Sequence, residues 1–80
     1  MGNELNGFFT TSDTPFAAFL YASGVRLVEL DRSNPQRVAF VFDSPDADLI
    51  AGWQKSTAMV NVRAFWSGLQ EMKARLARED

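Results

Sequence analysis

A run rich in valine and leucine and a run rich in valine and phenylalanine flank a short polar segment within residues 25–43. Valine and phenylalanine favour β-strands, whereas Ser33, Asn34 and Pro35 between the runs favour a turn. The pattern therefore predicts an antiparallel β-hairpin. A hairpin is stable in water only when other elements cover one of its faces, so the rest of the chain must supply that cover.

The pairing of the two strands decides which side chains face a core. A five-residue turn at residues 32–36 places Asp31 opposite Arg37, where the two side chains are expected to form an ion pair. In this register one face carries the large apolar side chains that we expect helices to cover, namely Val28, Leu30, Val38, Phe40 and Phe42. The other face is polar near the turn and apolar at its open end, where we expect three uncovered residues, Val25, Leu27 and Val41.

Three helices are predicted from N-cap residues that precede a proline or a run of regularly spaced apolar side chains. The N-caps are expected at Thr14, Ser44 and Asn61, with a proline directly after the first two. Gly24 is predicted to end the first helix, because glycine adopts the left-handed conformation of a C-cap without strain. The second helix is expected to end near Lys55. The third is the longest, and its apolar residues recur at steps of three and four: Val62, Phe65, Leu69, Met72 and Leu76, with Trp66 widening the stripe.

Two further segments complete the predicted architecture. Residues 8–11 are aromatic and β-branched and are expected to form a first strand, and residues 58–60 a short edge strand. The predicted fold is a single α+β domain over residues 1–80, with residues 1–6 frayed and the order β-α-β-β-α-(β)-α. Its helices are expected to pack mainly on one face of a sheet built around the central hairpin.

The composition excludes several classes of site. The 80 residues contain no cysteine and no histidine, which removes thiolate chemistry, the commonest metal ligands and the commonest general base. Asp43, Asp46 and Asp48 are clustered carboxylates, but Asp46 and Asp48 fit the first turn of a helix better than an acid–base site. No apolar run is long enough to span a membrane. We therefore expect no enzyme activity, no cofactor, no metal and no membrane contact, and a reducing cytoplasm as the location.

The chain carries more large apolar surface than one face of a small sheet can cover. Tryptophan and tyrosine are enriched at the energetic centres of protein interfaces, which makes the two tryptophans and the tyrosine the first candidates for contact residues. The sequence thus predicts a non-enzymatic interaction module that binds a protein partner or associates with itself as a homodimer. The candidate binding residues are Trp53, Trp66, Tyr21, Val25, Leu27 and Val41.

A nucleic-acid-associated accessory protein is the alternative function. The predicted turn carries Arg32 and Arg37, and Arg26 precedes the first strand of the hairpin, so the three guanidinium groups are candidates for phosphate contacts. The net charge of −2 disfavours a protein that mainly coats nucleic acid. We therefore favour a protein-binding function over this nucleic-acid-binding alternative.

Two segments resemble the signatures of a family of short, uncharacterised bacterial and phage-associated proteins, a domain of unknown function. They are Phe-Phe-Thr-Thr-Ser-Asp at residues 8–13 and Asp-Arg-Ser-Asn-Pro-Gln-Arg-Val-Ala-Phe-Val-Phe at residues 31–42. The similarity also includes Trp53 and the residues 61–65 that begin the third predicted helix. The resemblance implies a bacterial or phage cytosolic origin, and it implies no mechanism.

Overall fold

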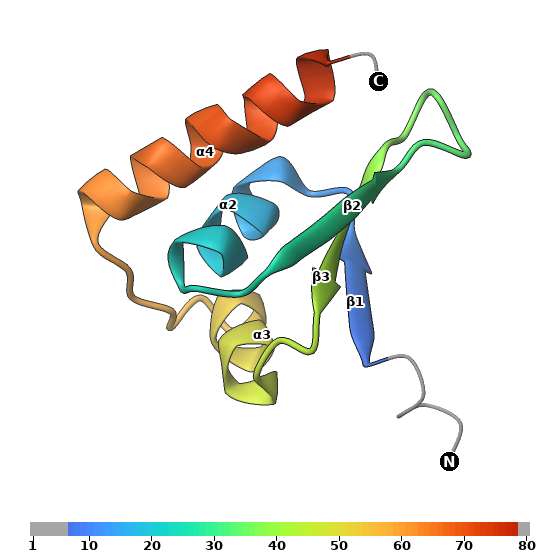
Figure 1. The fold of residues 1–80 in the computed structure, drawn as a ribbon. Coiled ribbons are helices and arrows are strands. Elements are labelled where there is room, and N and C mark those ends of the chain that lie inside the picture. Colours follow the sequence, from blue (N-terminus) through green and yellow to red (C-terminus); the bar gives the residue numbers. More distant parts are fainter. Residues whose placement is uncertain (1–6, 79–80) are drawn as a thin grey trace.

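The computed structural model describes residues 7–78, which form a three-stranded antiparallel sheet and three helices (Figure 1). The order along the chain is β1 (Phe8–Thr11), α2 (Thr14–Ala22), β2 (Leu27–Asp31), β3 (Ala39–Asp43), α3 (Ala47–Gln54) and α4 (Val62–Ala77). The strands are arranged as β1-β3-β2 in the sheet. The predicted α+β class is confirmed. The expected fraying of residues 1–6 lies outside the described residues.

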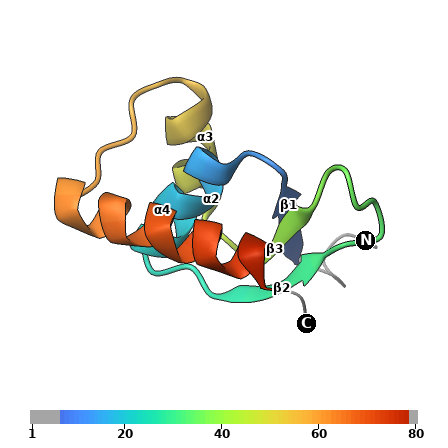
Figure 2. The same ribbon diagram turned by 90° about the horizontal axis from the view of Figure 1, so that it is seen from above.

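The helices lie on one side of the sheet, and no other element of residues 7–78 covers the opposite side (Figures 1 and 2). The core lies between the sheet and the helices. Its largest fully buried side chains come from α2, β3 and α4, namely Phe19, Leu20, Phe40, Phe42 and Met72. β3 is the central strand, so its inward phenylalanines contact the core from the middle of the sheet.

Helix α2 is the central element of the core. Its five consecutive residues 16–20 are each at most 6% exposed, so the helix is buried on every side rather than along one stripe. The predicted N-cap at Thr14 is wrong, because the carboxylate of Asp13 accepts a hydrogen bond from the Phe16 N–H at 3.2 Å. The prediction for Gly24 is confirmed by its φ of 93° and by the 3.1 Å hydrogen bond from the Val25 N–H to the Leu20 carbonyl.

The hairpin has a longer turn and a different register from those predicted. Asp31 pairs with Ala39 rather than with Arg37. The connection between the two strands is therefore residues 32–38, two residues longer than the predicted turn at residues 32–36. A β-bulge then interrupts β2, because Leu27 lies opposite Phe42 and Glu29 lies opposite Val41, which leaves Val28 as the extra residue.

The bulge changes the face of the sheet to which the side chains at the start of β2 point. Opposite a buried Phe42, Leu27 turns toward the helices, and both Leu27 and Val25 pack against the core. The prediction that these two residues remain uncovered is therefore wrong. Val41 lies opposite Thr10 and Glu29 on the uncovered side.

The segment between β3 and α4 also differs from the prediction. Helix α3 starts at Ala47 with Asp46 as its N-cap, and the predicted cap Ser44 instead adopts a left-handed conformation with φ of 49°. Residues 58–60 form no strand, so the predicted edge strand is wrong. The N-cap at Asn61 is confirmed, since its side chain accepts a hydrogen bond from the Ala64 N–H at 3.0 Å.

Helices α2 and α4 approach each other closely at Gly68. A Cβ atom added to Gly68 would lie 2.9 Å from the carbonyl oxygen of Ala18, which is closer than packed atoms tolerate. Ala18 is itself fully buried. The small residues Gly68 and Ala18 therefore set the separation of the two helices.

Candidate functional site

Trp53, one of the predicted contact residues, packs against helix α2. Its ring stacks on Phe16 with centroids 5.3 Å apart and an interplanar angle of 3°, and on Phe19 at 5.4 Å. Phe16 in turn meets Phe9 of β1 edge to face at 5.5 Å. Trp53 is half-buried, and its main role is to hold α3 on the core.

Trp66 belongs to a group of apolar side chains that face solvent at the start of α4. Trp66 is 59% exposed, Val62 is 81% exposed, and Met59, just before the helix, is 91% exposed. Val62 and Trp66 are one turn apart and lie on the same side of the helix. We call Met59, Val62 and Trp66 the helix patch. Tyr21, the remaining aromatic candidate, is 37% exposed on α2.

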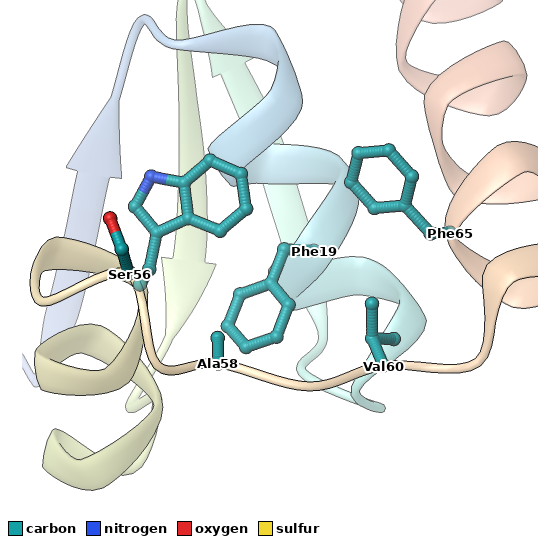
Figure 3. Close-up of a pocket in the computed structure, with 6 residues that line it drawn as sticks. Phe19, Ser56, Ala58, Val60 and Phe65 are labelled. Carbon is teal, nitrogen blue, oxygen red and sulfur yellow. The ribbon is translucent and has the colours of Figure 1, made fainter.

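A cavity of about 420 Å³ lies beneath the connection between α3 and α4 (Figure 3). Figure 3 shows that Phe19 from α2, Val60 from the connection and Phe65 from α4 line this space from different elements. The lining is mainly apolar: Phe19, Trp53, Ser56, Ala58, Val60 and Phe65. A surface of this chemistry accepts an apolar group, with the hydroxyl of Ser56 as a hydrogen-bonding side chain at its margin.

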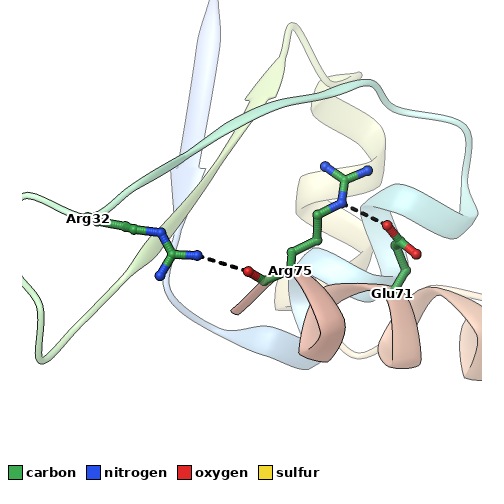
Figure 4. Close-up of polar contacts among 3 residues, drawn as sticks. All are labelled: Arg32, Glu71 and Arg75. Carbon is green, nitrogen blue, oxygen red and sulfur yellow. Dashed lines mark hydrogen bonds and ion pairs between the residues drawn. The ribbon is translucent and has the colours of Figure 1, made fainter. Parts of the chain in front are cut away.

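The three arginines proposed for phosphate contacts occupy different surroundings. Arg26 forms an ion pair with Asp43 at 3.7 Å. Arg32 donates hydrogen bonds from Nη2 to the backbone carbonyls of Arg75 and Arg78, both at 2.9 Å, the first of which is drawn in Figure 4. Arg32 thus caps the C-terminal end of α4, where a positive charge is favoured by the helix dipole.

Arg37 lies apart from the other two arginines of the prediction. It lines a groove beside Asp13 and Thr14 at the start of α2. The predicted ion pair between Arg37 and Asp31 is absent from the described residues. The Asp31 carboxylate instead accepts a hydrogen bond from the Ser33 N–H at 3.0 Å, and hydrogen bonding by Ser33 holds the pKa of Asp31 below its usual value.

A cluster of arginines forms where the hairpin meets the end of α4. Arg32, Arg75 and Arg78 line a cleft of about 290 Å³ together with Glu29 and Leu30. Arg75 also forms an i,i+4 ion pair with Glu71, with Nε and Oε2 2.7 Å apart (Figure 4). The cleft combines cationic side chains from the hairpin and from the end of α4, which are far apart in the sequence. The predicted trio of Arg26, Arg32 and Arg37 did not include Arg75 or Arg78.

A family model for a domain of unknown function, DUF5659, matches residues 6–78. The chain belongs to the DUF5659 family. No curated protein and no solved structure matches it. The resemblance to a domain of unknown function is therefore confirmed over nearly the whole chain.

Within residues 7–78 of this DUF5659 domain, no group of three or more acidic side chains is placed to hold a metal ion. No helix in the same part of the chain is long and apolar enough to cross a membrane. Every fully buried residue there is apolar or glycine, and the buried side chains leave no nitrogen or oxygen without a hydrogen-bond partner.

Three exposed apolar residues of the DUF5659 domain were not predicted as contact residues. Met59 lay in the predicted edge strand, Val62 in the core stripe of α4, and Phe8 in the first strand, yet Phe8 is 54% exposed. The signal for Val62 was its position in the first turn of α4, one turn before Trp66. At that position the helix extends beyond the partner helix that would cover it.

Proposed function

We propose that this DUF5659 domain is a small, non-enzymatic interaction module that binds a protein partner and associates with itself. The exposure of the helix patch is the observation that carries the proposal. Large apolar side chains gathered on one surface mark protein–protein contact sites, and tryptophan is the residue most enriched at their energetic centres. Val62 and Trp66 lie one turn apart on α4, Met59 precedes the helix by three residues, and each of the three is more than half exposed.

The chemistry of the remaining residues supports a role without catalysis. A general acid or base needs a pKa moved toward neutrality, usually by burial. The Asp31 carboxyl group is exposed, and hydrogen bonding by Ser33 lowers its pKa, which is a change away from neutrality. The chain also has no cysteine or histidine to serve as a nucleophile or base.

Light scattering over a wide concentration series tests self-association. The wild-type protein should gain apparent mass as its concentration rises, and Trp66→Ser should remain monomeric. Ala74→Ser, which alters an exposed residue elsewhere on the same helix, should behave as the wild type. A wild-type protein that stays monomeric at every concentration would remove self-association.

Nucleic-acid binding is the second candidate, and the arginine-lined cleft supports it better than the predicted trio does. Arg75 and Arg78 add two guanidinium groups beside Arg32. Fluorescence anisotropy with labelled single- and double-stranded oligonucleotides tests this function. Binding should weaken steeply with salt and be lost in the double variant Arg75→Ala with Arg78→Ala. Affinity that is independent of salt, or no binding at low salt, would exclude it.

A bacterial or phage origin and a cytoplasmic location are part of the same proposal. The origin is supported by the resemblance carried by residues 8–13 and 31–42. The location is supported by the absence of cysteine, because small domains outside a reducing compartment usually depend on disulfides.

A further inference from the structure

The uncovered side of the sheet is a second surface with apolar residues at its centre. Directly paired residues share a face, so the pairs Phe8–Asp43, Thr10–Val41 and Asp31–Ala39 place six side chains away from the helices. Phe8 is 54% exposed, and Val41 is half-buried. We call these six residues and Glu29, which lies opposite Val41, the open sheet face.

The open sheet face carries negative charge. Its own residues include the carboxylates of Glu29, Asp31 and Asp43. The guanidinium of Arg26 lies 3.7 Å from Asp43 and offsets one of them. Asp31 accepts a hydrogen bond from the Ser33 N–H, and its carboxylate is ionised at neutral pH, as an exposed aspartate is without any pKa shift.

The helix patch has the opposite charge. Arg63, the exposed residue directly after Val62, is cationic, and residues 49–70 contain no aspartate or glutamate. Lys73 lies seven residues after Trp66, so it continues the stripe of Val62 and Trp66 along the exposed side of α4. The helix patch is therefore apolar with a cationic border.

These charges discriminate between the ways in which two copies can meet. Two helix patches brought together would oppose lysine and arginine with lysine and arginine, and two open sheet faces would oppose carboxylates with carboxylates. Like charges across an interface are unfavourable, whereas opposite charges steer association and fix the pairing. From this complementarity we propose that the protein self-associates head to tail, with the helix patch of one copy on the open sheet face of the next.

The positions of the two surfaces determine what such a contact builds. The start of α4 and the open side of the sheet lie at opposite ends of the molecule (Figures 1 and 2). A standard interface buries about 800 Å² on each partner, roughly one seventh of the 5417 Å² surface of the chain, so one copy has room for both contacts. Contacts between unlike surfaces give rings or open chains rather than two-fold dimers. The expected products are therefore oligomers larger than a dimer.

A mixing experiment tests the head-to-tail arrangement, which rests on the proposed self-association. Trp66→Ser disables the helix patch and Phe8→Ser disables the open sheet face. Each variant alone should be monomeric by light scattering. Their equimolar mixture should form a one-to-one dimer that grows no further, because one intact copy of each surface remains. Thr10→Arg is a second block of the sheet face, in case Phe8→Ser perturbs β1, and circular dichroism checks that each variant is folded.

The outcomes separate this inference from the proposed function. If the sheet-face variants associate as the wild type does while Trp66→Ser is monomeric, the helix patch pairs with itself and the head-to-tail arrangement is wrong, although self-association stands. If the wild type is monomeric throughout, both fail. The dependence of self-association on salt concentration is an independent test, since association through opposite charges should weaken as the salt concentration is raised. Association that strengthens with salt would overturn the charge argument.

Discussion

The close approach of α2 and α4 at Gly68 leads to a prediction in which one chemical change has opposite effects at two positions. Gly68→Ala and Gly52→Ala each replace a glycine inside a helix by alanine. At Gly68 the new methyl carbon would lie 2.9 Å from the carbonyl oxygen of Ala18. At Gly52 it would lie 3.6 Å from the Cα of Ala58, an ordinary van der Waals distance.

The expected magnitudes follow from these distances. Alanine is favoured over glycine inside a helix by about 1 kcal/mol, so Gly52→Ala should raise the free energy of unfolding by up to about that amount. Gly68→Ala has the same gain in helix propensity, but its new methyl group must displace a backbone carbonyl. Overpacking of this kind costs about 1 to 3 kcal/mol. The two variants should therefore differ by about 1 to 3 kcal/mol, with Gly68→Ala the less stable.

Thermal and urea denaturation followed by circular dichroism measure the difference. In a domain of this size 1 kcal/mol corresponds to about 4 to 8 °C in melting temperature, so the separation is easily resolved. Gly52→Ala serves as the control, because it cancels the helix-propensity gain common to both variants. Equal stability of the two variants, or greater stability of Gly68→Ala, would refute the close contact between the helices.

Three further predictions concern the hairpin. Phe40→Ala should lower the free energy of unfolding by about 3 to 5 kcal/mol in chemical denaturation, because Phe40 is fully buried; a silent change would contradict its place in the core. Arg32→Ala should lose about 1 kcal/mol through its two hydrogen bonds to the end of α4, whereas Arg37→Ala should change stability little; equal effects would refute the cap. The lowered pKa of Asp31 means that its contribution to stability is complete above the unfolded pKa of about 3.9 and is lost as the pH falls through the folded pKa. Denaturation midpoints measured against pH should therefore fall less on the acid side for Asp31→Asn than for the wild type, and identical acid limbs would exclude a role for this carboxylate.

Local signals in the sequence were sufficient where a single residue type has one dominant conformational use. Gly24 and Asn61 were placed correctly because a left-handed C-cap favours glycine and an N-cap favours a short polar side chain. The same reasoning placed the first N-cap at Thr14, one residue after the observed N-cap Asp13. Ser12, Asp13 and Thr14 are all suitable caps, and only the course of the chain from β1 selects Asp13.

Features that depend on contacts between distant segments were not accessible in this way. The bulge at Val28 turns the side chains of Leu27 and Val25 to the opposite face of the sheet, and the alternation of apolar residues in the sequence does not predict this bulge. Gly68 has its role only because α2 lies against α4. Arg32 had the sequence context of an exposed turn residue, and its function as a cap requires the end of α4 to lie beside the hairpin. Of the candidate contact residues, Trp66 is exposed as expected, whereas Trp53, Val25 and Leu27 pack against the core.

The modest attachment of α3 has a consequence for the motions of the DUF5659 domain. No residue of α3 is buried, and the helix is held mainly by the half-buried side chains of Leu49, Ile50 and Trp53. Elements with little buried surface open at a lower free energy than the rest of a protein. Backbone amides of α3 should therefore exchange with solvent deuterium before those of α2, through an opening that lifts Trp53 from Phe16 and Phe19 while the sheet stays intact. Such an excursion would briefly expose the rings of Phe16, Phe19 and Trp53 beside the cavity, without any global unfolding.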